Sequence, residues 1–364
     1  MKLKVAVVGY GKLGTIHARL INDHPGFDLV AIVDPIAQNR DKAANHLGIA
    51  TYDDVSKVVS SVDCAVVATP TAFHHKVCAT LLDNGKHVLV EKPITATPQE
   101  ARSLVNLAKG NDLTLQVGHV VRFDHRFRAA EQRIQSPKLI ECTRASGYTF
   151  RSMDVGVTLD LMIHDLDLVL ALVDSPLQSL QAIGTSVIGP HEDVAHARLT
   201  FENGAIANLT ASRVSYEQVR KMAVTGQFGF VAVDFLEQDT ITTLSPGVAL
   251  ESLEVAPNTL TAEEQQEVSD RFFVDLLAKS VIPVKPTNAI AEEQHDFYEA
   301  ITENRSPIVS GETGEQVLTI ATRIVNTIKA GSTNEPVITG GPHFSQSRDL
   351  VKELGIHRSN VRGL

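Results

Sequence analysis

The chain has 364 residues, of which 43% are hydrophobic and 21% charged, and its formal net charge is −10. This length exceeds that of one typical domain and predicts two, while an acidic chain without a dense Lys/Arg run is not typical of nucleic-acid-binding proteins. Cys64, Cys78 and Cys142 are far apart and predict no disulfide framework. No apolar stretch reaches the roughly 20 residues of a membrane-spanning helix, so we expect a cytoplasmic protein without a membrane partner.

A glycine-rich turn separates a short β-branched run, 4–8, from a helical pattern, 12–20. The segment Gly9-Tyr10-Gly11-Lys12-Leu13-Gly14 is a full GxGxxG in the strand, turn and helix context that gives this motif meaning. The first glycine permits the tight turn, the second lets a pyrophosphate approach backbone amides, and the third lets the helix pack close to the strand. The predicted dinucleotide-binding residues of this turn are Gly9, Gly11, Lys12, Leu13 and Gly14.

The second apolar run, 28–33, ends at an acidic residue. Asp34 lies 20 residues beyond Gly14, the expected place for a carboxylate that binds the adenosine ribose hydroxyls. A carboxylate there repels a 2′-phosphate, so the sequence predicts NAD as the cofactor. NADP stays as the alternative because Arg40 is near.

Strand and helix patterns continue to alternate through the first part of the chain. Strand-like runs at 64–68, 87–90 and 115–121 and a helical pattern at 73–84 predict a parallel, doubly wound α/β sheet. Ligands of such sheets bind at the carboxyl ends of the strands. The residues expected to face the cofactor there are Thr69, Pro70, Thr71, Glu91 and Lys92.

The pattern changes after residue 121, where we place the boundary between a Rossmann domain, 1–121, and a second domain, 122–343. A helix is expected at 125–134, and strands are expected at 180–187, 194–201 and 205–212, with an Asn203-Gly204 hairpin turn. An α+β domain with an open, mainly antiparallel sheet follows, and one face of this sheet is a candidate interface. Helices are expected at 290–303 and 313–329, and residues 344–364 are a tail or short helix without an assigned function.

A candidate catalytic pair lies on a helix expected at 159–172. Asp160 and His164 are four residues apart and project from one face, and Asp167 continues that face. Oxidation of an alcohol requires a base for the hydroxyl proton, and a neutral imidazole can serve near pH 7. A surface ion pair, or a cation site formed together with Asp165, are the alternatives.

These residues together resemble the Gfo/Idh/MocA family of sugar and inositol dehydrogenases over almost the entire chain. The resemblance lies in the glycine turn, in Thr69-Pro70-Thr71 with His74, in Gly85-Lys86-His87-Val88 leading to Glu91-Lys92-Pro93, and in Asp160-x-x-x-His164. It implies a Rossmann domain, a second domain whose sheet forms the substrate wall and often an oligomer interface, and a homodimer or homotetramer. It also implies a cis peptide before Pro93.

The resemblance implies that Lys92, Asp160 and His164 form the catalytic group and that His74 belongs to the cofactor site. His164 would accept the hydroxyl proton, Asp160 would orient the imidazole, and Lys92 would donate to the substrate oxygen or relay the proton. His75, His87 and His119 are more simply interpreted as structural or exposed histidines.

The segments 160–165 and 207–213 most resemble the branch that oxidises nucleotide sugars, notably UDP-N-acetylglucosamine at its 3-hydroxyl. A free sugar or inositol dehydrogenase is the alternative within the family, and a non-catalytic NAD-binding sensor is the alternative outside it. Candidate substrate-binding residues are Arg122, Arg213 and Tyr216. Structural roles are equally open for all three, and for Arg122 the structural role would be an interdomain salt bridge.

Overall fold

The computed structural model describes residues 2–149, 154–188, 190–247 and 260–331. The first domain is a six-stranded parallel sheet of order β3-β2-β1-β4-β5-β6. Its strands are β1 Leu3–Val8, β2 Phe27–Val33, β3 Ala50–Tyr52, β4 Cys64–Val67, β5 His87–Glu91 and β6 Leu115–Gly118. Its helices are α1 Lys12–Asp23, α2 Ala37–Leu47, α3 His74–Asp83 and α4 Pro98–Gly110.

Separate hydrophobic clusters cover the two faces of this sheet, which is why its strands are continuous apolar runs rather than alternating ones. The strand order reverses between β1 and β4, the place where doubly wound sheets bind ligands. The predicted parallel α/β sheet is therefore confirmed. The last strand is shorter than the expected 115–121, because the chain leaves the sheet at Gly118 and forms a 3-10 turn at Val120–Phe123.

The second domain is an eight-stranded sheet of order β14-β13-β12-β11-β7-β10-β9-β8, antiparallel except for the β7–β10 pair. Its strands are β7 Pro137–Ala145, β8 Leu177–Thr185, β9 Val194–Phe201, β10 Ile206–Ser212, β11 Val219–Gly226, β12 Gly229–Asp234, β13 Thr240–Pro246 and β14 Leu277–Pro283. The predicted open, mainly antiparallel sheet is confirmed.

Three helices of this part of the chain pack on one face of the second sheet: α5 His125–Glu131, α6 Ile163–Leu172 and α10 Gly311–Gly331. Strands β9 and β10 alternate buried and less buried residues, as expected when one face contacts the core. Gly204 forms the predicted hairpin turn between them with a φ of 79°. The helix expected at 159–172 begins with a π-helical turn at Thr158–Met162 that continues into α6.

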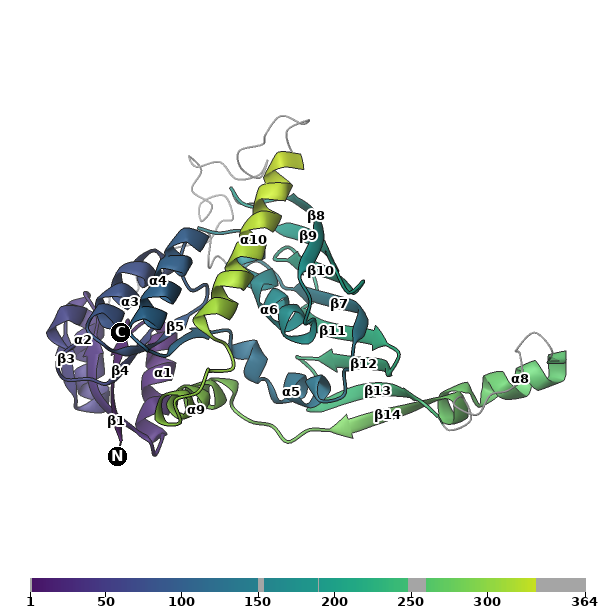
Figure 1. The fold of residues 1–364 in the computed structure, drawn as a ribbon, viewed down its shortest axis with the longest axis horizontal. Helices are drawn as coiled ribbons and strands as arrows, with labels where there is room; N and C mark the ends of the chain where they lie inside the picture. Colours follow the sequence, from purple (N-terminus) through teal and green to yellow (C-terminus); the bar gives the residue numbers. More distant parts are fainter. Residues whose placement is uncertain (1, 150–153, 189, 248–259, 332–364) are drawn as a thin grey trace, which may run out of the picture.

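After β14 the chain returns to the first domain, which the boundary at 121 does not anticipate. Helix α9, Ala289–Thr302, packs against α1 and the 3-10 turn (Figure 1), and its Phe297 is fully buried among residues of the β1 and β2 core. Val309 and Leu318 join the opposite core of the same sheet. The region 122–343 is thus not one structural unit, since 289–318 completes the first domain.

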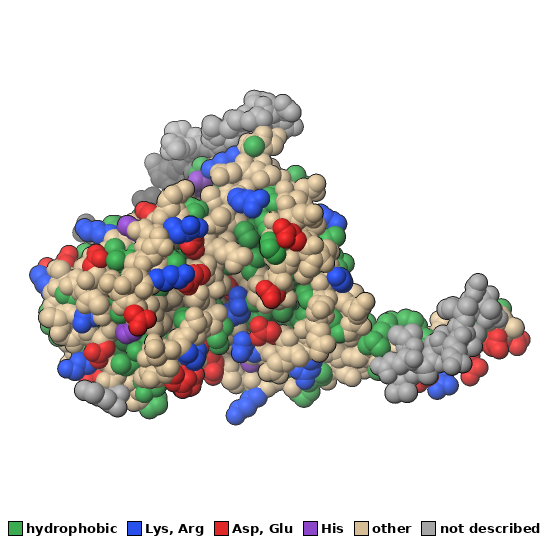
Figure 2. Space-filling view, viewed as in Figure 1, with side chains coloured by type: hydrophobic (Ala, Val, Ile, Leu, Met, Phe, Trp, Pro, Cys, Tyr) green, Lys and Arg blue, Asp and Glu red, His purple; other side chains and the backbone are tan. Residues whose placement is uncertain are grey.

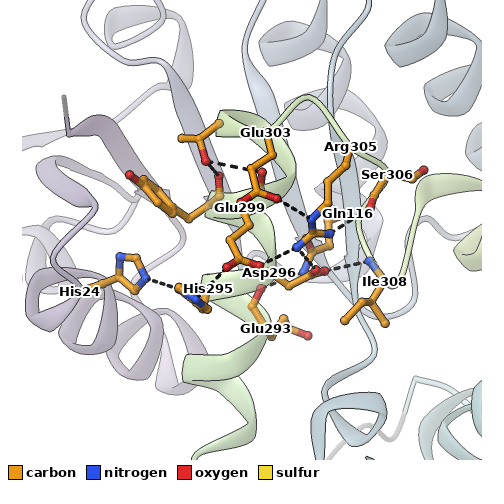
Figure 3. Close-up of polar contacts among 12 residues, drawn as sticks. His24, Gln116, Glu293, His295, Asp296, Glu299, Glu303, Arg305, Ser306 and Ile308 are labelled. Carbon is orange, nitrogen blue, oxygen red and sulfur yellow. Dashed lines mark hydrogen bonds and ion pairs between the residues drawn. The ribbon is translucent and has the colours of Figure 1, made fainter.

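Ion pairs of Arg305 fix the segment after α9, as Figure 3 shows. The guanidinium lies 2.8 Å from Asp296, 2.9 Å from Glu299 and 3.5 Å from Glu303. The other oxygen of Asp296 accepts a 2.8 Å hydrogen bond from the Ile308 amide. One buried carboxylate therefore links α9 to the segment that pairs with β6.

An arm extends from the second sheet at β13 and β14 (Figure 1). It carries α8, Ala262–Asp270, and a π-helical turn at Phe272–Leu276. Among the described helices none is long and apolar enough to cross a membrane. The tail predicted at 344–364 lies outside the described residues.

Candidate active site

The three glycines of the β1–α1 turn meet different constraints. Gly9 has a φ of +93°, and a Cβ there would lie 2.6 Å from the Ala68 carbonyl oxygen. A Cβ on Gly14 would lie 1.8 Å from the Gly9 carbonyl oxygen, so the protein itself requires glycine at both positions. A Cβ on Gly11 would meet nothing within 4 Å. The amides at the start of α1 have no side-chain cap at Gly11, so the turn fits a pyrophosphate that approaches this face.

The carboxylate at the end of β2 is fixed by its surroundings. Asp34 is 5% exposed and accepts hydrogen bonds from the amides of Tyr10 at 2.7 Å and Ile36 at 2.8 Å, and from Asn39 at 3.0 Å. Arg40 donates to the carbonyl oxygens of Asp34 and Pro35. This part of the fold therefore offers negative charge at the place where an adenosine ribose binds, which fits NAD better than NADP.

His74 connects the two loops that follow β4 and β5. Its ring nitrogens lie 2.8 Å from the Thr69 carbonyl oxygen and 2.9 Å from the Pro93 carbonyl oxygen, and the residue is 1% exposed. The buried ring therefore holds together the loops that follow β4 and β5. The Lys92–Pro93 peptide in the second loop is cis, as the resemblance implies.

Lys92 and Asp160 meet where the two domains join. Lys92 follows β5, and its Nζ donates to the Asp160 carbonyl oxygen at 2.8 Å and lies 3.4 Å from the Asp160 carboxylate. The side chains are 18% and 28% exposed, so the pair is accessible but largely desolvated. Asp160 belongs to the π-helical turn, and its carbonyl oxygen and Oδ1 both lie near the lysine. The ammonium group has a further N–H that can donate a hydrogen bond to a substrate oxygen.

His164 lies at the start of α6, and its Nδ1 has no hydrogen-bond partner among the described residues. Burial, followed by the positive charges of Lys92 and Arg144, holds the pKa of this imidazole well below its usual value of 6.5. The ring is therefore neutral near pH 7 and able to accept a proton. Asp160 contacts Lys92 in this arrangement, whereas the sequence suggested that it would orient the imidazole.

The two other carboxylates of this segment hold arginines. Asp165 lies 2.6 Å from Arg144 and Asp167 lies 2.8 Å from Arg122, and all four side chains are buried. Arg122 thus forms the ion pair that the sequence left as its alternative role, between the turn after β6 and α6. Within the described ranges no group of three or more His, Cys, Asp or Glu side chains is arranged to bind a metal. Asp165 and Asp167, two of the four candidate ligands of a cation site, are thus engaged by arginines.

The remaining candidate substrate residues, Arg213 and Tyr216, differ in burial and in contacts. Arg213 is 5% exposed, pairs with Asp193 at 2.6 Å and donates to the Val155 carbonyl oxygen at 2.9 Å. Its guanidinium lies over the Tyr148 ring, 5.3 Å from the centroid. Tyr216 is fully exposed. Arg213 is therefore a buried, ion-paired side chain, whereas the Tyr216 side chain is exposed to solvent.

His119 was interpreted from the sequence as an ordinary histidine, but it lies next to the site. Gly118 of β6 pairs with Glu91 of β5, so His119 follows β6 at the level where Lys92 follows β5. It is 1% exposed, and neither ring nitrogen has a hydrogen-bond partner within the described residues. Burial lowers the pKa of its imidazole. The rule that selected Thr69 and Lys92, position at a strand's carboxyl end, also selects His119.

Glu91, the residue before Lys92, is held by a hydrogen bond to a buried side chain. His17 lies 2.8 Å from its carboxylate, and Gln294 of α9 lies 2.9 Å from the other nitrogen of His17. Hydrogen bonding to His17, with the charges of His17 and Lys92, outweighs burial and lowers the pKa of Glu91. Because α9 supplies Gln294 from far along the chain, spacing in the sequence does not reveal this contact.

Comparison with known proteins identifies the same two domains. An oxidoreductase family model with an NAD-binding Rossmann fold matches residues 3–119, and the GFO/IDH/MocA C-terminal domain matches 116–232. UDP-N-acetylglucosamine 3-dehydrogenase from Acidithiobacillus ferrooxidans is 30% identical over 329 residues, 90% of this chain and 98% of that protein. Its solved structure is similar with a TM-score of 0.79 at 28% identity, covering 91% of this chain and 99% of that chain.

NAD-dependent scyllo-inositol 2-dehydrogenase from Bacillus subtilis is 28% identical over 264 residues, which are 67% of this chain and 77% of that protein. The family matches cover the Rossmann domain and much of the second sheet, in the order in which the structure has them. The chain belongs to the Gfo/Idh/MocA family of NAD-binding oxidoreductases.

Proposed function

We propose that the protein oxidises a secondary hydroxyl of a nucleotide sugar with NAD, and that the 3-hydroxyl of UDP-N-acetylglucosamine is the first candidate. The observation that carries this proposal is the meeting of Lys92, from the cofactor domain, with Asp160 beside a neutral His164. UDP-N-acetylglucosamine 3-dehydrogenase combines 30% identity with a match over 98% of its length, against 28% and 77% for the Bacillus inositol enzyme and 22% and 93% for myo-inositol 2-dehydrogenase from Thermotoga maritima. This difference favours the nucleotide sugar over a free sugar or inositol.

His164, Lys92 and Asp160 have separate roles in the proposed reaction. Bound NAD supplies the acceptor for the hydride that leaves the substrate carbon. His164 accepts the hydroxyl proton because its ring is neutral and Nδ1 is not engaged by another described residue. Lys92 donates a hydrogen bond to the substrate oxygen and stabilises the charge that develops there, while Asp160 fixes the ammonium.

The cofactor would be held by residues that lie along the carboxyl edge of the first sheet. Amides of the glycine turn bind the pyrophosphate, and Asp34 binds the ribose. The loops that His74 joins would lie near the nicotinamide. We assign this cofactor site to Gly9, Gly11, Lys12, Leu13, Gly14, Asp34, Thr69, Pro70, Thr71, His74, Glu91 and Lys92.

The test is the absorbance of reduced nicotinamide during incubation with NAD and a panel of nucleotide sugars, free sugars and inositols. We expect an increase with UDP-N-acetylglucosamine that Lys92→Ala and His164→Ala each reduce by about 10² to 10⁴-fold. Lys109→Ala, which changes an exposed lysine on α4, is the matched control and keeps full activity. An increase with inositol alone supports the inositol alternative, and NAD binding without turnover of any compound supports the sensor.

The same proposal includes a cytoplasmic location and assembly as a homodimer or homotetramer. All three cysteines are buried free thiols, which suits a reducing compartment. The outer face of the second sheet keeps large apolar side chains such as Ile183 in solvent, at 72% exposure. Fractionation of the source cells tests the location, and light scattering of the purified protein tests the assembly.

A further inference from the structure

The arm of the second domain protrudes from the rest of the protein. Figure 2 shows it clear of the main body, with apolar side chains gathered where it leaves the sheet. Helix α8 packs on the π-helical turn Phe272–Leu276, and this turn packs on β14. The described part of the arm therefore has its own internal contacts and is connected to the body through β13 and β14.

The arm exposes large apolar side chains that a solitary subunit leaves in water. Phe273 is 57% exposed, Val274 is 71% exposed and Val281 is 58% exposed. Phe272 stacks edge to face on Phe273, with 5.1 Å between ring centroids, and is itself 37% exposed. A contiguous apolar surface of this kind marks an interaction site.

The helix of the arm, α8, is negatively charged. Helix α8 has the sequence AEEQQEVSD, which contains four acidic residues and no basic one. Arg271, the next residue, is paired with Asp275 at 2.6 Å and does not offset this charge. A partner surface for the arm should therefore combine an apolar recess with a positive side chain at its edge.

Such a recess exists on the chain itself, at the root of the arm. A pocket of about 400 Å³ lies between the end of α5 and the strands β12 to β14. Arg133 stands at this pocket as an exposed side chain and forms no ion pair with any described residue. The other lining residues are Phe228, Phe230, Val231, Thr243, Ser245, Ser280 and Ile282.

We propose that Phe273 and Val274 of one subunit bind this pocket on a second copy of the chain, and that the acidic α8 lies against Arg133 there. A two-fold axis between antiparallel arms brings the turn Phe272–Leu276 of each arm to the root of the other, so one contact is made twice and the assembly closes. On one chain the pocket is lined by residues of β12 to β14, whereas Phe273 lies four residues before β14 begins, so the two surfaces are separate and each can be filled by the other copy.

The inference deepens the assembly part of the proposed function and rests on it. A monomeric protein would contradict both, whereas an oligomer that survives loss of the arm contact would contradict only the arm. Neither result bears on the proposed reaction, which is measured separately as NAD reduction.

The first experiment is light scattering and sedimentation equilibrium on the full chain. Phe273→Asp and Arg133→Glu should each raise the dissociation constant of the arm-dependent dimer at least about 100-fold, with the melting temperature and NAD binding unchanged. Asp270→Arg should recover part of the affinity in the Arg133→Glu chain, because it restores opposite charges. Ile183→Asp adds a charge at an exposed apolar position of the edge strand β8, on the sheet face that is the competing interface, and should leave the arm-dependent dimer intact.

A cross-link identifies which subunit fills the pocket. Val274→Cys in one chain and Ser280→Cys in a second, differently tagged chain should form a disulfide when mixed, while the native cysteines stay buried. Unchanged mass for Phe273→Asp together with dissociation of Ile183→Asp would overturn the proposal in favour of the sheet face. The double variant Val274→Cys/Ser280→Cys gives a second test. A disulfide that forms within one chain of this variant, with none between the two single variants, would also overturn the proposal.

Discussion

The Nζ atom of Lys92 is closer to the backbone oxygen of Asp160, at 2.8 Å, than to its carboxylate, at 3.4 Å. A lysine that directly follows a strand of the cofactor domain is thus held by the backbone of a π-helical turn in the second domain. The side chain of Asp160 adds charge to this contact but is not its only support. Replacing the carboxylate should therefore leave the lysine in place.

We expect Asp160→Asn to reduce kcat about tenfold, much less than the 10² to 10⁴-fold reduction expected for Lys92→Ala. The asparagine keeps the backbone contact and removes only the negative charge. Steady-state kinetics with NAD in excess measure both variants. An equal loss in the two variants would show that the carboxylate itself takes part in proton transfer.

The pH dependence of kcat/KM should follow His164. Because burial and neighbouring positive charges lower its pKa, the ring becomes protonated only well below pH 6.5, and the acid limb of the profile should lie there. Activity should therefore persist at pH 6.5, where an unperturbed histidine would be half protonated. In His164→Gln the acid limb should disappear from the residual activity, and a limb that stays in place would assign it to another group.

Two substitutions in the glycine turn should distinguish an effect on cofactor binding from an effect on folding. Gly11→Ala should fold with an unchanged melting temperature, because a Cβ there meets nothing within 4 Å, yet it should bind NAD at least about tenfold more weakly. Gly14→Ala should lose stability as well, because its Cβ would clash with the Gly9 carbonyl oxygen at 1.8 Å. Thermal melts and titration with NAD distinguish the two. Normal NAD affinity in Gly11→Ala would remove the pyrophosphate from this turn.

Cofactor choice should depend on the residue at the end of β2. Asp34→Ser removes a carboxylate that repels a 2′-phosphate, and we expect the preference for NAD over NADP to fall by about 10 to 100-fold, or about 1.4 to 2.7 kcal/mol. The ratio of kcat/KM values for the two cofactors measures it. Asp28→Ser, an exposed position on the same strand, is the control.

Glu293 on α9 should destabilise the folded protein at neutral pH. Burial first, then the charges of Glu91, Asp296 and Asp167, raises the pKa of its carboxyl well above 4.5, and neither oxygen has a hydrogen-bond partner among the described residues. The unfolded chain ionises near pH 4.5 while the folded one stays protonated. Stability is therefore lost as the pH rises from 4.5 to the folded pKa, by about 1.4 kcal/mol for each pH unit within that interval.

Glu293→Gln should accordingly raise the free energy of unfolding at pH 8, with a gain that shrinks toward pH 4.5. Glu292→Gln changes the adjacent, more accessible carboxylate and should have little effect at either pH. Urea unfolding at the two pH values measures the difference. A gain that is independent of pH would mean that packing, not ionisation, accounts for it.

Local patterns predicted the first sheet and the cofactor turn because their signals lie within about 30 consecutive residues. The positions of Lys92 and Asp34 follow from strand ends in the same way. The partners of Arg122 and Arg213 are 45 and 20 residues away, and no spacing rule selects Asp167 or Asp193 as those partners. For Arg122 the sequence therefore left substrate binding and ion pairing equally open.

Other features escaped prediction because they depend on tertiary packing. The expected helix 159–172 carries a π-helical turn at its start, which hydrophobic periodicity does not distinguish from an α-helix. The rule of position at a strand's carboxyl end selects His119 as well as Lys92, but only the register of β5 and β6 shows that the two residues leave the sheet at the same level. The return of α9 to the first domain joins residues far apart in the sequence, such as Phe27 and Phe297.

The return of α9 also affects how the protein can fold during synthesis. Domains usually fold as units while the chain emerges from the ribosome, the N-terminal one first. Here the first domain needs Phe297, Val309 and Leu318 to complete its two cores. Its sheet must therefore wait, partly uncovered and open to misassociation, until the ribosome has made the second domain as well.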